Sequence, residues 1–357
     1  MSSVIVQQPA VTADSVSLGL DDPDHLYEKV TLLQEIQRPR LGPPFQRVLK
    51  GWTLKFARPA VDRMEYLLQV VDSNGTERLI ADPKNPNRAA GPFGEKSVIE
   101  WPHYRVPEWL DHRLERVGSV ADHAVYSQSL RTPIRLQLWS SHGTRPGDPL
   151  PLLIVHDGPE YHEFSSLTMF LDAKCETGEL PRMRAALLAP NDRDHTYSAS
   201  AAYTHALAHE ILPWLRRHAP SPDGRWARVG AGASLGALAM LHAHRTYPAA
   251  LGALFLQSGS FFRQRFDKQE SAFVRFRRIT RFVGQVLTAQ EWPAPIPVTM
   301  TCGVVEENRT NNLALAAALR GQGYSISFAE HRDAHNWISW RDTFQPHLVD
   351  LLKRAWM

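Results

Sequence analysis

The feature that most constrains this chain is the sequence Gly-Ala-Ser-Leu-Gly at residues 232–236. An apolar run ending at Ala231 precedes it, and helix-forming residues follow from Ala237. A strand, a turn too tight for side chains at its two glycines, and a helix beginning beside the serine make up a nucleophile elbow. The alternative is an ordinary turn with a structural serine, which the flanking pattern disfavours. We therefore expect Ser234 to be a nucleophile and the chain to be a serine hydrolase.

The second part of the chain alternates between predicted strands and helices. Apolar runs at residues 150–158 and 185–190 are typical of buried strands, and apolar residues recur at helical spacing over 203–218 and 311–320. This alternation indicates a mostly parallel sheet covered on both faces. We expect an α/β-hydrolase domain over residues 113–357.

The first part has a different character. Short runs at residues 47–56, 66–71 and 97–101 are bounded by turn formers and predict strands. We expect a small β-sandwich over residues 21–112. Residues 1–20 are small and polar, with little to bury, and are expected to form a flexible arm.

Length and charge agree with a two-domain enzyme. The chain has 357 residues and a formal net charge of +3, with basic residues scattered along it. Arginines cluster only at 275–281, where a solvated helix face is favoured over an anion-binding one. No stretch approaches the length of a spanning helix, and no secretory leader is evident. We expect a cytoplasmic protein without nucleic-acid or membrane partners; a homo-oligomer is left open.

The other members of a catalytic triad must follow the serine, in the order acid and then histidine. Glu306 lies just after the predicted strand 297–303, and His335 lies in the loop after the predicted strand 325–330. We therefore expect Glu306 to be the acid and His335 the base. Glu307 remains an alternative acid, whereas Asp333 is expected to shape the loop.

An oxyanion hole requires two backbone N–H groups. We expect one from Leu235, directly after the serine, and one from the loop at residues 156–161, where Gly158 would let the backbone approach a substrate closely. A metal site at His156, Asp157, Glu160 and His162 is disfavoured, because a complete triad needs no metal. No cofactor is expected.

These motifs resemble the enterochelin (ferric enterobactin) esterase and esterase D-type branch of the α/β-hydrolases. The resemblance runs through most of the chain. It departs from the family pattern at Asp333-Ala334, where two glycines are frequent, and at Asn336, where an aspartate is frequent. The matching segments are residues 156–158, 193–197, 210–213, 232–236, 256–260, 302–306, 335–337 and 340–341 in the second part, and 63–66, 82–86 and 91–94 in the first.

The resemblance implies an immunoglobulin-like front sandwich and a carboxylesterase that acts on a bulky or polar ester through an acyl-serine intermediate. A siderophore trilactone is one implied substrate. Acyl transfer to a sugar or lipid hydroxyl would use the same triad, and a non-catalytic glycan-binding protein is a third hypothesis. The residues expected to contact substrate are Asp157, Tyr161, Arg193 and Trp337.

Overall fold

The computed structural model describes residues 9–37, 40, 42 and 44–357. The chain divides into two compact units, each described here by itself. The first unit comprises residues 1–105 together with 303–307 and 331–339, and the second comprises residues 106–302, 308–330 and 340–357. The two later segments of the first unit contain Glu306 and His335. The first unit thus extends beyond the residues expected to form a front domain.

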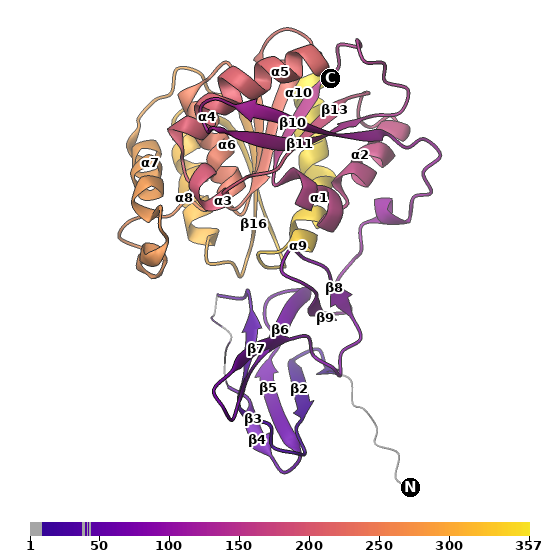
Figure 1. Cartoon of the computed structure of the whole chain (residues 1–357), viewed down its shortest axis with the longest axis vertical. Coiled ribbons are helices and arrows are strands. Elements are labelled where there is room, and N and C mark those ends of the chain that lie inside the picture. Colours follow the sequence, from indigo (N-terminus) through magenta and orange to yellow (C-terminus); the bar gives the residue numbers. More distant parts are fainter. Residues whose placement is uncertain (1–8, 38–39, 41, 43) are drawn as a thin grey trace. The chain divides into compact units, whose positions relative to one another are not determined.

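The strands of the first unit form two antiparallel sheets that bury one apolar core (Figure 1). One sheet has the order β1-β2-β5-β4, and the other has the order β3-β6-β9-β8 with β7 paired to β6. Side chains from both sheets, such as Leu54 and Tyr66, meet in this core. The strands are β1 (Ala10–Val11), β2 (Ser15–Asp21), β3 (Tyr27–Gln34), β4 (Gln46–Val48), β5 (Gly51–Ala57), β6 (Arg63–Asp72), β7 (Glu77–Ile80), β8 (Arg88–Ala89) and β9 (Lys96–Glu100).

Two expectations for this region need correction. The expected arm at residues 1–20 is wrong for its second half, because β2 alternates buried and half-buried side chains and places Val16, Leu18 and Leu20 in the core. Residues 1–8 lie outside the described part of the chain. The single strand expected over 47–56 is a hairpin, in which β4 and β5 pair around a turn and Gly51 adopts a φ of 155°.

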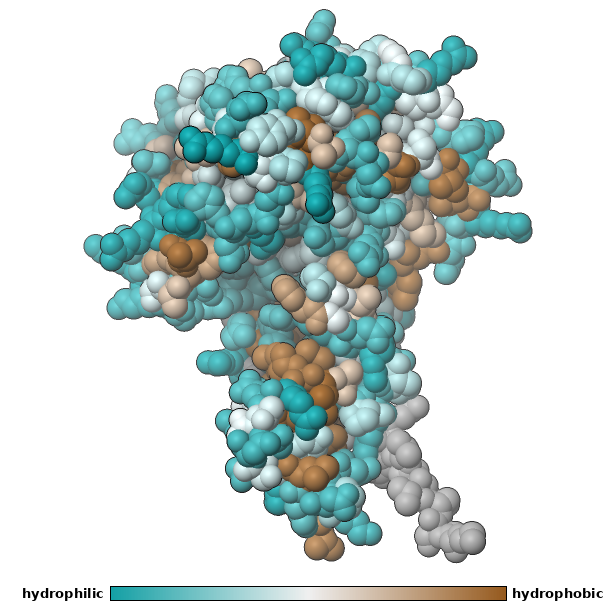
Figure 2. All heavy atoms as spheres, viewed as in Figure 1, coloured by the Kyte–Doolittle hydropathy of each residue, from teal (hydrophilic) through white to brown (hydrophobic). Residues whose placement is uncertain are grey.

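Apolar side chains also appear on the surface of the first unit (Figure 2). Leu33 on β3 and Leu79 on β7 are 44% and 53% exposed. Both strands pair with β6, so these residues belong to one sheet. Single exposed leucines are common on soluble proteins and need no special explanation.

The second unit is built on an eight-stranded sheet in the order β10-β11-β13-β12-β14-β15-β16-β17. β11 pairs antiparallel with both β10 and β13, whereas the pairings from β13 through β16 are parallel. The mostly parallel sheet expected from the sequence is confirmed. The strands are β10 (Ser119–Ser127), β11 (Thr132–Ser140), β12 (Leu152–His156), β13 (Arg184–Leu188), β14 (Arg228–Ala233), β15 (Ala253–Gln257), β16 (Pro297–Gly303) and β17 (Ser325–His331).

Helices cover this sheet on both faces (Figure 1). None of those in the described residues is long and apolar enough to cross a bilayer. A turn of π-helix interrupts one helical run at η2 (Leu207–Ile211), and the chain is kinked at Gln345 within η5 (Phe344–Leu348). The short 3₁₀ turns are η1 (Glu108–Asp111), η3 (Arg225–Ala227) and η4 (Lys268–Ala272). The α-helices are α1 (Gly158–Phe164), α2 (Leu167–Glu176), α3 (Arg193–Thr196), α4 (Ala201–Ala206), α5 (Leu212–His218), α6 (Leu235–Thr246), α7 (Phe276–Thr288), α8 (Arg309–Gly321), α9 (Trp337–Asp342) and α10 (Val349–Trp356).

The strand order reverses at β12, and ligands of open α/β sheets bind at such reversals. The chain passes from β12 to β13 on one side, whereas β14 pairs with β12 on the other, with Val155 opposite Ala231. The loops after β12 and β14 therefore diverge, and the carboxyl ends of such strands border a crevice in open α/β sheets. The loop after β12 begins at Asp157, and the turn after β14 contains Ser234.

Candidate active site

Ser234 occupies the turn between β14 and α6 in the second unit. Its backbone has φ 55° and ψ −122°, a conformation that non-glycine residues rarely adopt and that persists only where the surroundings enforce it. Close packing leaves little room for a side chain at either of the two flanking glycines. A Cβ on Gly232 would lie 2.7 Å from the carbonyl carbon of Gly236, and one on Gly236 would lie 3.1 Å from Cβ of His156. The strand-turn-helix expected from the sequence is present.

Hydrogen bonds from the next strand fix the turn at Ser234. Its N–H donates to the carbonyl oxygen of Gln257 at 2.9 Å, and its own carbonyl accepts from Ser260 at 3.1 Å. The Oγ atoms of Ser234 and Ser260 lie 3.0 Å apart. Ser260 was not expected at the site, because nothing in its local sequence distinguishes it from other serines in loops.

Leu235 and Gly158 are both the first residues of helices, α6 and α1. The first N–H groups of a helix have no partner within the helix, so they can bind an anion at its N-terminus. The expected close approach of Gly158 to a substrate stays a prediction, but packing also requires glycine at this position. A Cβ there would lie 2.2 Å from Cα of Leu187, so glycine is required for packing α1 against β13.

Asp157 and Arg193 form a two-pronged ion pair beside the elbow. Arg193 donates from Nε to Oδ1 at 2.9 Å and from Nη2 to Oδ2 at 2.8 Å. The carboxylate is buried, whereas the Arg193 side chain is 37% exposed. Because Arg193 occupies both carboxylate oxygens, the guanidinium offers the more accessible surface of this pair to a ligand.

Tyr161 corrects an expectation. It was expected to contact substrate, but its side chain is 2% exposed and lies in the interior of the second unit. Its hydroxyl donates to Oε1 of Gln257 at 2.6 Å, and Nε2 of Gln257 donates to Oγ1 of Thr343 and to the carbonyl of Trp340. Burial raises the pKa of Tyr161 well above its ordinary value. The residue connects β15 to the C-terminal helices.

His156 connects β12 to the elbow. Its Nδ1 lies 3.0 Å from the carbonyl oxygen of Gly236, and its Nε2 lies 2.7 Å from the hydroxyl of Tyr203. Burial lowers the pKa of His156 to about 3, so the ring is neutral at physiological pH. Both ring nitrogens of His156 thus have hydrogen-bond partners within the protein. No group of three or more potential metal ligands is found among the described residues.

Glu306 and His335 form a hydrogen-bonded pair in the first unit. Oε2 of Glu306 lies 2.8 Å from Nδ1 of His335, and Oε1 accepts from the N–H of Gly303 at 2.7 Å. Glu306 is 1% exposed, whereas Glu307 is partly exposed. A carboxylate can only accept, so in the neutral ring the proton is on Nδ1 and the lone pair is on Nε2. That is the protonation pattern of a general base.

The structure thus groups the expected residues into two sets. Glu306, His335 and Trp337, the first residue of α9, belong to the first unit. Ser234, Leu235, Gly158, Asp157 and Arg193 belong to the second unit. The hydrogen bond between Ser234 and His335 stays a prediction.

Other histidines in the second unit have structural explanations. His242 pairs with the hydroxyl of Thr204 at 2.7 Å, and His244 pairs with the hydroxyl of Tyr324 at 3.1 Å. Burial lowers the pKa of His242 to about 4 and that of His244 to about 3. Both rings are therefore neutral at physiological pH; His244 is fully buried, whereas His242 is half-buried.

The arginine cluster at the start of α7 lines a cavity of about 470 Å³. Arg278 donates to the carbonyl oxygens of Ser198 and His195, and Arg275 lies 2.7 Å from Nδ1 of His195. Arg277 and Arg281 are exposed. The cluster therefore combines two arginines that contact α3 and the segment after it with two that are solvated.

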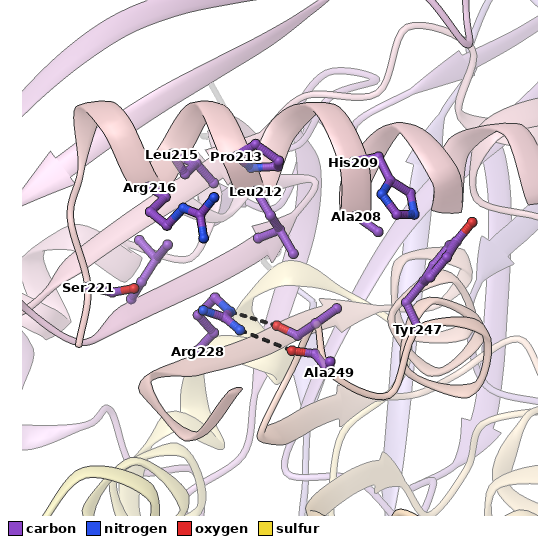
Figure 3. A pocket seen from close by; sticks show the side chains of 12 residues that line it. Ala208, His209, Leu212, Pro213, Leu215, Arg216, Ser221, Arg228, Tyr247 and Ala249 are labelled. Carbon is purple, nitrogen blue, oxygen red and sulfur yellow. Dashed lines mark hydrogen bonds between the residues drawn. The ribbon is translucent and has the colours of Figure 1, made fainter. Parts of the chain in front are cut away.

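A second cavity has a volume of about 310 Å³. Figure 3 shows the side chains that line it. Its lining includes Leu152 and Arg228, the first residues of β12 and β14. Arg228 donates to the carbonyl oxygens of Ala249 and Ala250. Because Ser234 follows the other end of β14, this cavity is separate from the elbow.

Comparisons with known proteins agree with this geometry. The family model named Esterase matches residues 127–351. Iron(III) enterobactin esterase of Escherichia coli strain K12 is 26% identical over 309 residues, which cover 83% of this chain and 72% of that protein. The corresponding enzyme of E. coli O6:H1 strain CFT073 is 25% identical over 306 residues, with the same coverage of 83% and 72%.

Solved structures share the fold. The enterobactin esterase of Shigella flexneri, crystallised in the presence of enterobactin, superimposes with a TM-score of 0.77 at 21% identity, covering 98% of this chain and 96% of that one. A ferulic acid esterase superimposes with a TM-score of 0.58 at 15% identity, covering 68% of this chain and 100% of that one. The resemblance to the enterochelin esterase branch is confirmed, and the chain belongs to the Esterase family.

Proposed function

We propose that this protein is a carboxylic ester hydrolase in which Ser234 is the nucleophile, His335 the general base and Glu306 the acid that orients it. The observation that carries the proposal is the 2.8 Å hydrogen bond between buried Glu306 and His335. A serine hydroxyl needs such a base, and the base needs a carboxylate to fix its tautomer and stabilise the imidazolium.

The proposed reaction has two halves. Oγ of Ser234 attacks the ester carbonyl carbon while Nε2 of His335 takes the hydroxyl proton, and the N–H groups of Leu235 and Gly158 bind the oxyanion. Collapse of this intermediate breaks the bond to the alcohol oxygen, which takes the proton from His335. Water then attacks the acyl-serine with the same base, which releases the acid and restores Ser234.

We propose a siderophore ester of the enterobactin type as the substrate. The relatives from E. coli are named iron(III) enterobactin esterases, and the neighbour from S. flexneri was crystallised with enterobactin. Arg193 supports this choice, because its partly exposed guanidinium beside the elbow suits oxygen-rich, anionic groups. We propose Trp337 as an apolar contact for this substrate. The first unit is interpreted as the immunoglobulin-like sandwich that the resemblance implies.

The test is an assay of the purified protein on ferric enterobactin, ethyl ferulate and a nitrophenyl ester, with product masses measured. We expect cleavage of all three carboxylic esters, with the highest kcat/KM on ferric enterobactin, and labelling of the protein by a fluorophosphonate. An added alcohol should not divert the acyl group from water. No cleavage of any ester together with no fluorophosphonate labelling would overturn the proposal.

A further inference from the structure

The segments that carry Glu306 and His335 are attached to the two-sheet part of the first unit. We call residues 303–307 the acid loop and residues 331–339 the histidine loop. The N–H of Gln37 donates to the carbonyl of Val305 at 2.9 Å, and the N–H of Asp62 donates to the carbonyl of Arg332 at 2.8 Å. Val305 and Ala334 are members of the apolar core formed by the two sheets. Both loops thus complete a core whose other members come from the first half of the chain.

A buried arginine extends this attachment to the residues that flank His335. Arg63, the first residue of β6, is 3% exposed. Its Nη1 donates to Oε1 of Glu65 at 2.8 Å and to Oδ1 of Asn336 at 3.4 Å, and it lies 3.9 Å from Oδ2 of Asp333. Asp333 and Asn336 lie before and after His335 in the sequence. The guanidinium therefore holds the histidine loop on both sides of the catalytic ring.

The two partners of Arg63 also organise the loop internally. Oδ1 of Asp333 accepts from the N–H of Ala334 at 2.6 Å and from Nδ2 of Asn336 at 3.0 Å. Oδ1 of Asn336 accepts from the N–H of Ser339 at 2.8 Å. Burial raises the pKa of Asp333 to about 7, against the opposing charge of Arg63. Oδ2 of Asp333 has no hydrogen-bond partner among the described residues, so Arg63 is its principal counter-charge.

We propose that Arg63 is a positioning residue for catalysis: it fixes the histidine loop so that His335 keeps its hydrogen bond to Glu306. This inference rests on the proposed role of His335 as the base. It assigns the two-sheet part of the first unit a share in building the catalytic pair. Substrate contacts made by Arg193, in the second unit, would not depend on Arg63.

Removing the guanidinium should therefore affect the rate more than the binding of a small ester. In Arg63→Met, Glu65 and Asp333 lose their buried counter-charge and the histidine loop loses its anchor. Because a displacement of about 1 Å at a catalytic group can cost about a hundredfold in rate, we expect kcat on a nitrophenyl ester to fall by about tenfold to a hundredfold. KM should stay within about twofold. Arg63→Lys retains the charge but not the planar set of donors, and should recover part of the rate.

The matched control is Arg78→Met, the same substitution at an exposed arginine on β7 of the same unit. It should leave kcat and KM unchanged. If Arg63→Met does not fold, as judged by circular dichroism and the urea midpoint, Asp333→Asn tests the same contact without leaving a buried charge. We expect its kcat to fall by severalfold.

A readout independent of turnover completes the test. In full-length protein carrying ¹⁵N-labelled histidine, the Nδ1 proton of His335 should give a low-field resonance that is lost in His335→Ala. This resonance should broaden or shift in Arg63→Met and stay in place in Arg78→Met. A folded Arg63→Met protein with unchanged kcat and an unchanged resonance would overturn the inference. Full activity of His335→Ala would instead overturn the proposed function, while the resonance would still report the effect of Arg63.

Discussion

At the scale of single residues, geometry separates candidates of the same chemical type that lie close together. Ser234 and Ser260 have hydroxyl oxygens 3.0 Å apart, yet only Ser234 occupies the strained turn at the start of α6. Glu306 and Glu307 are adjacent, yet only Glu306 is fully buried with its carboxylate on His335. A catalytic role requires a reactive group that is held in a fixed orientation, and these contacts fix the orientations of Ser234 and Glu306.

Ser234→Ala should abolish ester hydrolysis and fluorophosphonate labelling, because alanine can adopt the turn but has no oxygen to attack with. Ser260→Ala is the matched control, since it removes a hydroxyl 3.0 Å away while leaving the elbow intact. We expect the control to stay within about tenfold of the parent in kcat. Labelling of Ser234→Ala at the parent's rate would move the nucleophile elsewhere.

Glu306→Gln should lower kcat by at least about a hundredfold, because the amide no longer stabilises the imidazolium that forms on His335. Glu307→Gln has the same chemistry at a partly exposed neighbour and should be mild. Steady-state kinetics on one nitrophenyl ester gives both values. The opposite ranking would make Glu307 the acid.

At the scale of elements, close backbone packing decides where the loops of the second unit lie. Gly158 allows α1 to rest on β13, and Gly232 and Gly236 allow the elbow to turn beside His156. These glycines bring two helix N-termini to the carboxyl ends of neighbouring strands, where unsatisfied N–H groups can bind an oxyanion. The sequence predicts glycine in such turns, but it does not say which neighbour excludes a side chain.

Gly158→Ala should therefore destabilise the protein by about 1–3 kcal/mol, because its methyl group would meet the backbone of Leu187. Gly284→Ala, within α7, is the matched control. A methyl group there has no atom within 4 Å, and alanine favours a helix over glycine by about 0.5–1 kcal/mol. Urea unfolding should show opposite signs for the two variants; an unaffected Gly158→Ala protein would contradict the packing explanation.

At the scale of the whole molecule, buried neutral histidines couple folding to pH. His156 and His244 have pKa values lowered to about 3, and His242 to about 4, each chiefly by burial. The unfolded chain binds protons at these sites below about pH 6.5, whereas the folded chain does not. Stability contributed by these groups is therefore complete above pH 6.5 and is lost progressively as the pH falls toward 3 to 4.

His244→Gln should make the stability of the protein depend less steeply on pH. Well below pH 6.5, each such histidine contributes up to about 1.4 kcal/mol of lost stability per pH unit, so the parent's urea midpoint should fall more steeply between pH 7 and pH 5 than the variant's. His103→Gln, on the surface, is the control and should keep the parent's slope. Asp333 has the opposite effect on the pH dependence of stability, because burial raises its pKa to about 7. This residue is present in all three proteins, so its effect is common to them. Parallel slopes for parent and His244→Gln would contradict the prediction.

The sequence by itself determined those features that depend only on residues close together in the chain. Ser234 could be placed at an elbow, and Glu306 and His335 after successive strands, because glycine spacing and runs of apolar residues are local properties. The hairpin of β4 and β5 and the strand β2 were missed, because small polar residues and a short turn hide an alternating pattern.

Only the tertiary structure decided which polar groups face each other. Arg63 and Asn336 are 273 positions apart, and nothing in the sequence around either residue indicates their contact. Tyr161 was expected to contact a ligand because it is the last residue of the predicted oxyanion loop, but packing against β15 and the C-terminal helices buries it. Such pairings depend on desolvation and on the directions of side chains from distant elements, and these are fixed only once the sheets and helices have packed.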